Sequence, residues 1–439
     1  MVSDYSQHHT FRDCRNRSSK DLEGMAADIL IVGGGVVGAA CAYFLRRSGA
    51  EVTLIDRGEF GKGCSHGNCG YVSPSHILPL CQPGAIGNTL KSMLSGSSPL
   101  YVKPRLDWQL WSWLWRFAGR CNRASMMDAG RARQSLLDSS RQLYSELIDS
   151  GELTECDWHT IGLLFVYLSQ SHFDHYGETN ELLEKEFGLG AKRLANPELQ
   201  QLEPALKPNV AGAWLYECDA HLRPDRLMAA WKRALEKQGI TIKEQVDWTG
   251  LEQSDGRVTA LKTSAGNLSA DQYVIATGAW SPQMASQLGC TIPIQPGKGY
   301  SITMERPETC PTYPMIFEEH RVAVTPLSDA YRIGSTMEFA GYDTSLNRRR
   351  LDMLTAGATH YLHTPVSNSP RVEWYGWRPM SCDGKPIIGR VPKFSNVCLA
   401  TGHSMLGVSM APATGKLVAE IIGGQLPHVD PHPLRVDRF

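Results

Sequence analysis

Apolar and polar positions near the N-terminus follow the order strand, helix, strand. Ile29–Val32 is a short apolar run, Gly33–Gly35 interrupts the pattern, and an alanine-rich apolar segment follows. A second apolar run, Val52–Ile55, ends on Asp56. Short apolar runs bounded by turn residues indicate buried strands, and the longer segment between them indicates a helix. The pattern therefore predicts one βαβ unit over residues 28–56.

The same criteria applied to the rest of the chain predict an α/β protein with no internal repeat. Strands are expected at 162–169, 213–216, 272–280 and 293–304, and as an antiparallel pair at 322–326 and 331–336. Helices are expected at 134–147, 174–187, 226–238 and 351–361, and as a last helix that ends at Gly423–Gly424. The strand at 272–280 ends in a small-residue turn, and we expect it to lie beside the first strand.

Tryptophan is concentrated in the segment 108–117. Trp108, Trp111 and Trp115 have the i, i+3, i+7 spacing that places them on one helix face. Such a face most often packs into the core, which is the expectation here. The alternative is a tryptophan-bearing face that meets a membrane surface or a partner subunit.

Composition and charge limit the classes of function. The chain has 439 residues, of which 42% are hydrophobic, and a formal net charge of −1. It has no basic stripe, so nucleic acid is not an expected partner. The cysteines are scattered, without a C-x-x-C pair or a zinc-like His/Cys cluster, which favours reduced thiols, a cytoplasmic setting and no metal. Residues 1–26 are polar and are expected to form a disordered leader.

The glycine-rich turn has the spacing of a dinucleotide-binding motif. Gly33 allows a tight turn, Gly35 leaves room for a pyrophosphate beside the backbone, and Gly38 allows close helix–strand packing. The helix N-terminus attracts phosphate, and Asp56 lies about 20 residues on, where a carboxylate meets ribose hydroxyls. A membrane helix or a signal segment is the alternative, but consecutive glycines weaken a helix and no cleavage-site pattern follows. We therefore expect an adenine dinucleotide site.

A second loop of small and polar residues, 64–74, follows the βαβ unit closely and is expected to cross the same cofactor. Cys64 and Cys69 lie five residues apart in this loop, as the redox pair of a flavin disulfide reductase would. That alternative needs a second glycine motif in mid-chain and a His–Glu pair near the C-terminus. The sequence shows neither, and His403 has no acidic residue nearby.

Six motifs occur in order along the chain. They are the glycine motif with Asp56, the Ser65–Asn68–Gly70–Pro74 loop, Ala276–Trp280, Lys298–Tyr300, Gly376–Pro379 with Asp383-Gly384, and Thr401–His403 with Gly407. Together they resemble the D-amino-acid oxidase family of flavoenzymes, especially its D-amino-acid dehydrogenase branch, over residues 27–425.

The resemblance implies a discontinuous Rossmann-like FAD-binding domain and a substrate domain with a large mixed or antiparallel sheet. It assigns 27–76, 200–290 and 374–439 to the first and 77–199 and 291–373 to the second. The FAD contacts it implies are Gly33, Gly35, Val37, Gly38, Asp56, Arg57, Ser65, Asn68, Gly70, Tyr71, Val246, Thr277, Gly278, Trp280, Gly402, His403, Met405, Leu406 and Gly407. Some relatives attach FAD through a C-terminal cysteine, but none lies in 399–439, so non-covalent FAD is expected.

The implied reaction is hydride transfer from Cα–H of a D-amino acid to flavin N5, which gives an imino acid that water hydrolyses. Arg378 matches the carboxylate-binding arginine of the family, unless it pairs with Asp383 instead. Tyr300 and His320 would line the other side of the substrate. Many relatives carry tyrosine near His320, so the resemblance does not fix the substrate range, and a histidine could bond the ring hydroxyl of cis-4-hydroxy-D-proline. Sarcosine or glycine oxidation and a non-catalytic flavin subunit are further alternatives.

The dehydrogenase branch implies a quinone or an electron-carrier protein as acceptor in place of oxygen. The tryptophan-rich segment is consistent with peripheral contact with a membrane, which would place the protein at its inner face.

Overall fold

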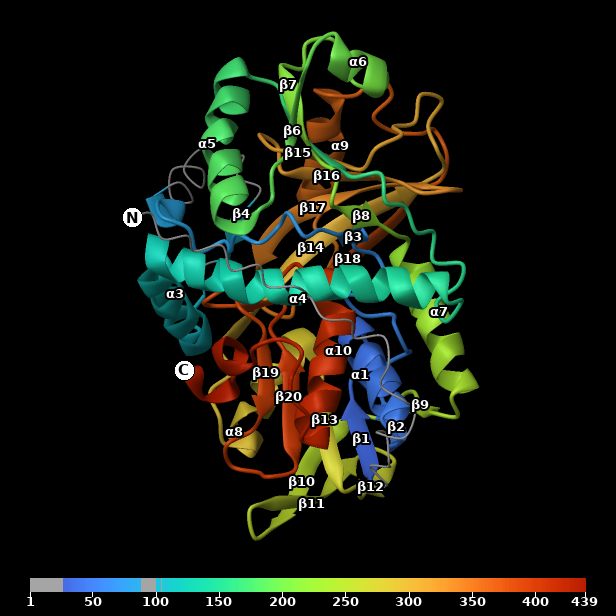
Figure 1. Ribbon diagram of the computed structural model, residues 1–439, viewed down its shortest axis with the longest axis vertical. Helices are drawn as coiled ribbons and strands as arrows, with labels where there is room; N and C mark the ends of the chain where they lie inside the picture. Colours follow the sequence, from blue (N-terminus) through green and yellow to red (C-terminus); the bar gives the residue numbers. More distant parts are fainter. Residues whose placement is uncertain (1–26, 88–99, 104) are drawn as a thin grey trace, which may run out of the picture.

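A computed structural model describes residues 27–87, 100–103 and 105–439, so the predicted leader lies outside the described residues. Two large sheets occupy the two halves of the molecule, and the long helix α4 (Arg123–Asp149) crosses in front of their junction (Figure 1). The predicted mixed α/β architecture is confirmed.

The six-stranded sheet forms one half and has the order β19-β20-β13-β1-β2-β9. Its strands are β1 (Asp28–Val32), β2 (Glu51–Ile55), β9 (Thr241–Lys243), β13 (Gln272–Ile275), β19 (Ile387–Arg390) and β20 (Val397–Thr401). β13 pairs with β1 in parallel, with Ile275 opposite Val32, as the sequence predicted. The carboxyl ends of β1, β2, β13 and β20 therefore meet at one edge.

β1 is a continuous apolar run because both faces of its sheet are covered. Ile29 and Ile31 pack with helices on one face, whereas Leu30 and Val32 pack on the other with a small three-stranded sheet. The covering helices include α1 (Val36–Arg47), α7 (Pro224–Lys237) and α10 (Gly407–Gly423). The small sheet consists of β10 (Trp248–Ser254), β11 (Arg257–Thr263) and β12 (Gly266–Leu268).

The nine-stranded sheet forms the other half, and its order is β18-β14-β17-β16-β15-β5-β7-β6, with β4 paired to β17. Its strands are β4 (Leu100–Val102), β5 (Leu163–Tyr167), β6 (Lys192–Ala195), β7 (Gly212–Tyr216), β14 (Ile294–Met304), β15 (Met315–Phe317), β16 (Val322–Pro326), β17 (Tyr331–Phe339) and β18 (Val372–Ser381). The predicted antiparallel pair is β16 and β17.

The remaining elements connect or cover these sheets. They are β3 (Tyr71–Val72), β8 (Ala220–His221), α3 (Trp108–Arg120), α5 (Gln170–Phe187), α6 (Glu198–Leu202), α8 (Ala285–Leu288), α9 (Arg348–Thr359), and the short helices η1 (Gly278–Met284), η2 (His432–Leu434) and η3 (Val436–Arg438).

Two sequence predictions are corrected by the fold. β7 and β18 belong to the nine-stranded sheet, so the predicted domain boundaries at 200 and 374 are misplaced around these strands. An apolar strand buried on both faces does not reveal which sheet it joins. α3 is a helix as expected, but Trp108, Trp111 and Trp115 are exposed, so their stripe does not pack into the core.

Candidate functional site

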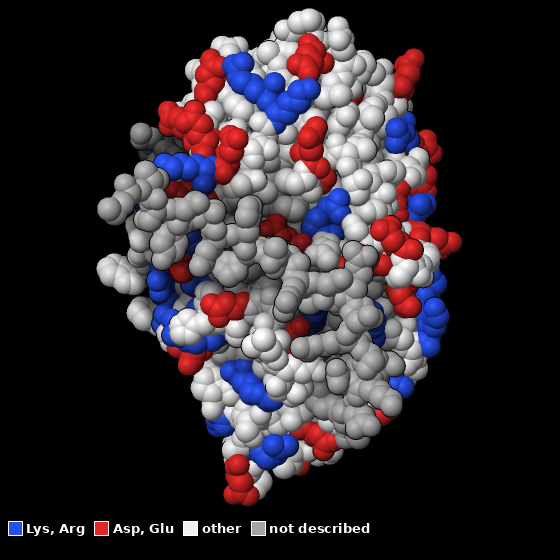
Figure 2. Space-filling view, viewed as in Figure 1, with Lys and Arg blue, Asp and Glu red and all other residues white. Residues whose placement is uncertain are grey.

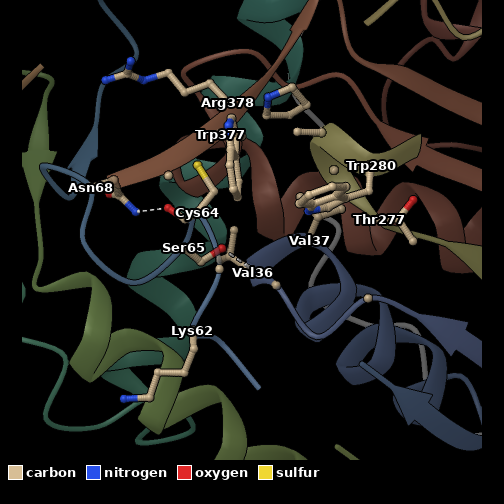
Figure 3. A pocket seen from close by; sticks show the side chains of 18 of the residues that line it. Val36, Val37, Lys62, Cys64, Ser65, Asn68, Thr277, Trp280, Trp377 and Arg378 are labelled. Atoms are coloured by element: carbon tan, nitrogen blue, oxygen red, sulfur yellow. Dashed lines mark hydrogen bonds between the residues drawn. The ribbon is translucent and has the colours of Figure 1, made fainter. Parts of the chain in front are cut away.

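A cavity of about 850 Å³ lies between the two sheets. One wall is the edge where β1, β2, β13 and β20 end, and the other is formed by β14 and β18. Ligands of open α/β sheets bind outside the carboxyl ends of the strands. Figure 3 shows this arrangement, with Val37 and Trp280 on the first wall and Trp377 and Arg378 on the second.

The glycines of the turn from β1 into α1 serve two purposes, close backbone packing at Gly33 and Gly38 and open space at Gly35. Gly33 has φ +115°, which favours glycine, and a Cβ there would lie 2.5 Å from the Ala276 carbonyl oxygen. A Cβ on Gly38 would lie 1.8 Å from the Gly33 oxygen, so Gly38 serves helix–strand packing and does not line the cavity. A Cβ on Gly35 would meet only Ser65 Oγ, at 3.4 Å.

Two helix N-termini meet at the cavity. α1 begins at Val36, whose N–H donates to Ser65 Oγ at 3.0 Å, and α10 begins at Gly407. Neither N-cap residue forms a side-chain capping hydrogen bond in the structure. A Cβ on Gly415 of α10 would lie 2.5 Å from the Ala40 backbone, so the two helices pack closely. Their aligned dipoles favour negatively charged ligand groups at this edge.

Asp56 ends β2 at the cavity. Its Oδ2 accepts the N–H of Gly34 at 2.6 Å, and its Oδ1 accepts that of Gly58 at 2.7 Å. These bonds hold the carboxylate at the position expected for contact with a ribose. The Arg57 guanidinium carbon lies 3.5 Å from the ring centre of Trp280, which also stacks on Tyr342 at 4.2 Å.

The loop after β2 crosses the cavity and is braced by Asn68. Its Nδ2 donates to the Cys64 carbonyl at 3.2 Å, and its Oδ1 accepts the Gly70 N–H at 2.8 Å. The Cys64 sulfur points toward Trp377 (Figure 3). Burial raises the pKa of the Cys64 thiol to about 11, so the thiol is protonated at neutral pH.

Arg378 lies at the far end of the cavity on β18. Its Nη1 donates to the Thr336 carbonyl at 2.8 Å, and burial lowers the pKa of the guanidinium from its ordinary value. A Cβ on Gly299 would lie 2.3 Å from Nη1, so this glycine makes room for the side chain. No carboxylate of the described residues pairs with Arg378. Asp383, the acid expected as an alternative partner, pairs with Arg438 at 2.9 Å. The alternative pairing with Asp383 is therefore wrong.

Most predicted site residues come together at the cavity, but several do not. Those that line it are Gly33, Gly35, Val37, Asp56, Arg57, Ser65, Asn68, Val246, Thr277, Gly278, Trp280, Tyr300, Arg378, His403, Met405 and Gly407. Those outside its lining are Gly38, Gly70, Tyr71, His320, Gly402 and Leu406. The two tyrosine hydroxyls bond to protein groups, Tyr71 to the Met315 and Val324 carbonyls and Tyr300 to Glu338 at 2.7 Å.

His320 is the one substrate prediction that the structure places elsewhere. It lies between β15 and β16, where its Nδ1 is 3.0 Å from the Tyr361 hydroxyl and its ring stacks on His360. His403 lies in the cavity wall with Nε2 2.9 Å from Thr414 Oγ1, and burial lowers the pKa of its imidazole to about 3. The imidazole is therefore neutral near pH 7.

Sequence reasoning missed part of the substrate-side wall. It includes Ser335, Leu346, Glu373, Trp374 and Tyr375. Trp374 packs so closely that a Cβ on either Gly67 or Gly376 would lie 2.3 Å from its ring. A glycine can indicate a bulky side chain close to the backbone, so Gly67 and Gly376 could have pointed to this wall. Nothing in the sequence shows that the two glycines face the same side chain.

Comparison with known proteins decides the family. The sequence model of the family described as FAD dependent oxidoreductase (DAO) matches residues 28–421. The chain belongs to this family. Its cofactor is FAD, and the resemblance drawn from the motifs is confirmed.

Relatives match the chain over nearly its whole length. A D-amino acid dehydrogenase of Granulibacter bethesdensis is 34% identical over 94% of this chain and 99% of the relative. One of Xanthobacter autotrophicus is 33% identical over the same shares of the two chains. The solved glycine oxidase of Geobacillus kaustophilus is 22% identical, covers 94% of this chain and 99% of its own, and has a TM-score of 0.77, which shows a shared fold.

The cavity fits FAD by its own geometry. Gly35 leaves the β1–α1 turn without a side chain where a diphosphate needs room, and two helix N-termini supply positive potential at this edge of the sheet. Asp56 would hold a ribose, and Ser65 and Thr277 add polar groups to the cavity lining. FAD supplies the hydride acceptor for the reaction.

Proposed function

We propose that the protein is a dehydrogenase that oxidises a D-amino acid at Cα. The observation that carries the proposal is Arg378, a cation in the cavity wall with no carboxylate partner among the described residues. Curated relatives with this activity in their names support the substrate class. An α-amino acid brings one carboxylate, and an unpaired charge in a buried site is costly. Substrate and guanidinium would neutralise each other.

Arginine suits this role better than lysine. The Thr336 carbonyl accepts a hydrogen bond from one N–H of Arg378. The planar guanidinium retains other donors that can bind both oxygens of a carboxylate. Trp377 precedes Arg378 and lines the same cavity, so it would help to exclude water. The chain thus binds and orients the substrate by its carboxylate end, while Tyr300 is proposed as a neighbour of the substrate.

The test is substrate reduction of the bound flavin without oxygen. Purified protein mixed anaerobically with D-amino acids, cis-4-hydroxy-D-proline, sarcosine or glycine should lose its yellow colour with a D-amino acid. Arg378→Lys and Arg378→Ala should keep bound FAD but lose turnover, at a cost of roughly 2–5 kcal/mol in substrate interaction. Arg438→Lys is the matched control, because this arginine pairs with Asp383 away from the cavity. Normal substrate affinity in Arg378→Ala would place the carboxylate site elsewhere.

We propose a quinone or an electron-carrier protein as the acceptor. The support is the word dehydrogenase in the names of the curated relatives. A quinone implies peripheral contact with a membrane. Fast production of hydrogen peroxide in step with substrate consumption would show oxygen to be the acceptor instead.

The remaining alternatives have weaker support. A specific site for hydroxyproline was argued from His320, which does not line the cavity. A disulfide reductase needs a thiolate, whereas burial keeps the Cys64 thiol protonated by raising its pKa. A non-catalytic flavin subunit would bind FAD, but no substrate in the anaerobic panel would bleach it.

A further inference from the structure

Lys298, in the middle of β14, is a buried lysine. Figure 2 shows lysine and arginine side chains spread over the visible face of the molecule, where water solvates their charges. Lys298 is only 1% exposed and forms no ion pair within the described part of the chain, since the Asp343 carboxylate pairs with Lys103 instead, at 3.8 Å. A buried charge is costly unless other groups compensate it. The contacts of the ammonium group therefore indicate its role.

The ammonium group of Lys298 binds backbone oxygens and two aromatic rings. Its Nζ donates to the Asp343 carbonyl at 2.6 Å and to the Ser345 carbonyl. It also lies 4.5 Å from the ring centre of Tyr375 and 5.3 Å from that of Tyr300, which is within the range of cation–π attraction. Burial lowers the pKa of the ammonium group from its ordinary value. These contacts take the place of water around the charge.

The two carbonyls belong to residues 341–346, a segment without regular secondary structure that connects β17 to α9. We call this segment the strap. It is bonded to both walls of the cofactor cavity. At the wall formed by β18, the Trp377 indole N–H donates to the Gly341 carbonyl at 3.1 Å. At the wall that includes η1, the Tyr342 hydroxyl donates to the Ala279 carbonyl at 2.7 Å.

The strap meets the cavity at Trp280. The Tyr342 ring stacks on the Trp280 indole, with ring centres 4.2 Å apart and an angle of 14° between the planes. The Trp280 and Trp377 rings meet edge to face at 5.2 Å, so the two walls are in contact next to the strap (Figure 3). Leu346, the last residue of the strap, lines the cavity itself. The strap therefore completes the cavity where η1 and β18 come together.

We propose that Lys298 is a positioning residue for FAD. It holds the strap against both walls, so that Tyr342 keeps Trp280 in place and Leu346 closes the wall, and bound FAD is released slowly as a result. Lys298 does not line the cavity, so it acts through the strap and takes no part in hydride transfer. The proposal rests on the FAD cofactor and is independent of the proposed substrate.

A role in the fold alone is the competing interpretation. Replacing Lys298 would then damage the interior as a whole, and saturating FAD would not restore a fully loaded protein. The surroundings argue for a local effect. Ser345 is exposed and Asp343 is half-buried, so water can bond the two carbonyls once the ammonium group is gone. Removal of a buried charge also removes its desolvation cost.

The experiment measures FAD release from the full-length, FAD-loaded protein after dilution, by the rise in flavin fluorescence. Lys298→Met should release FAD about tenfold faster than wild type, the usual scale for losing a hydrogen bond to a charged group. Saturating FAD should restore full flavin content. Chymotrypsin should cut the strap of Lys298→Met faster, after Tyr342 or Leu346, because the strap opens more often. None of these measurements needs a substrate.

A double-mutant cycle shows whether Lys298 acts through Tyr342. Tyr342→Ala removes the ring stack on Trp280 and the bond to Ala279, so it should also release FAD about tenfold faster. Lys298→Met added to Tyr342→Ala should raise the release rate by less than about twofold, because both changes free the same strap. A residue that serves only the fold would give independent effects, which multiply.

The matched control is Lys207→Met. The Lys207 Nζ also donates to a backbone carbonyl, that of Thr359 at 2.6 Å, but Lys207 lies outside the cavity lining. Its loss should leave FAD release unchanged. Lys298→Gln is the second variant at the buried position. It keeps a donor without the charge, so its release rate should lie between those of wild type and Lys298→Met.

Three outcomes would overturn the proposal. Lys298→Met could release FAD at the wild-type rate, or its effect could multiply with that of Tyr342→Ala. Alternatively, both variants at Lys298 could fail to fold while Lys207→Met folds normally. The last result would assign the buried lysine to the fold alone.

Discussion

The cavity has a nucleotide end at the turn from β1 into α1 and a substrate end at Arg378. Each end contains a residue with an unusual positive φ, a glycine at the first and a serine at the second. Gly33, at the nucleotide end, has φ +115°, and Ser335, at the substrate end, has φ +114°. Glycine adopts this conformation freely, whereas a serine there is strained. Ser335 lies at a register shift between β14 and β17, next to Thr336, whose carbonyl binds Arg378. The backbone at Gly33 is therefore free of strain, whereas Ser335 and Thr336, which has φ +51°, are strained beside the carbonyl that binds Arg378.

The largest effect is expected from closing the space at Gly38. Gly38→Ala would put a methyl group 1.8 Å from the Gly33 oxygen, which is a backbone atom that cannot move without opening the turn. We expect a loss of about 3 kcal/mol or more in unfolding free energy and little bound FAD. Thermal melting and flavin absorbance of the purified variant measure both.

Gly35→Ala is the matched control. Its methyl group meets only Ser65 Oγ at 3.4 Å, so the chain should fold with near-normal stability. FAD affinity should still fall, since the methyl group occupies the place expected for the pyrophosphate. Equal loss of stability in both variants would contradict the distinction between packing and cofactor contact.

At the substrate end, Gly299→Ala should act on Arg378 and not on the fold. The new methyl group would lie within 2.5 Å of three guanidinium atoms, which can swing away because they end a flexible side chain. KM for the amino acid should rise roughly 10- to 100-fold, about 1.4–2.8 kcal/mol, with FAD content unchanged. Steady-state kinetics test this.

Gly250→Ala is the control for Gly299→Ala. Gly250 is also in a strand, and its Cβ would meet only Lys262, at 3.6 Å. Unchanged KM in Gly299→Ala would mean that the guanidinium position does not govern substrate binding.

Local sequence was sufficient for the nucleotide end and insufficient for the substrate end. Gly33, Gly38 and Asp56 lie in one short segment, so their spacing alone predicts strand, turn, helix and acid. The substrate end joins the 62–69 loop with β14, β17 and β18, which are distant in sequence. Pattern reasoning cannot give the register that sets Gly299 beside Arg378. Resemblance placed Arg378 correctly in the cavity, but it carried His320 there as well.

The α3 stripe illustrates a second limit. The helical spacing of Trp108, Trp111 and Trp115 predicts that they share one helix face. It does not predict whether that face points to the core or to solvent. The same helix carries another apolar side, with Leu110 and Trp113, and this is the one that is buried. With apolar residues on both sides, periodicity alone could not choose between core and surface.

Asp219, in the turn between β7 and β8, should make the stability of the fold depend on pH. This carboxyl accepts the N–H and hydroxyl of Ser75, at 3.0 and 2.6 Å, and burial raises its pKa to about 7. The folded state therefore holds a proton that the unfolded state releases near pH 4. Stability should fall as pH rises from about 4 to 7, by at most about 1.4 kcal/mol per unit from this group.

Urea unfolding of wild type and Asp219→Asn at several pH values measures this contribution. The difference between the two proteins should change with pH only inside that window. A constant difference across the range would show that Asp219 does not titrate there.

The smallest effect is expected from relieving strain at the substrate end. Ser335→Gly should stabilise the fold by about 1 kcal/mol, because glycine tolerates φ +114°. It should also loosen the Thr336 carbonyl that holds Arg378, so KM should rise slightly. Melting curves and steady-state kinetics give the two values, and a destabilised Ser335→Gly would show that the serine side chain outweighs the strain.

The strand order of the six-stranded sheet has a consequence for synthesis of the chain. β1 pairs with β13, and β13 pairs in turn with β20, which ends at Thr401. At about 5–20 residues per second, the ribosome delivers β20 roughly 20–70 s after β1. During that interval the apolar β1 lacks its later neighbours and must be kept from other chains. Slower, cooler expression or a chaperone should therefore raise the yield of folded protein more than added FAD does.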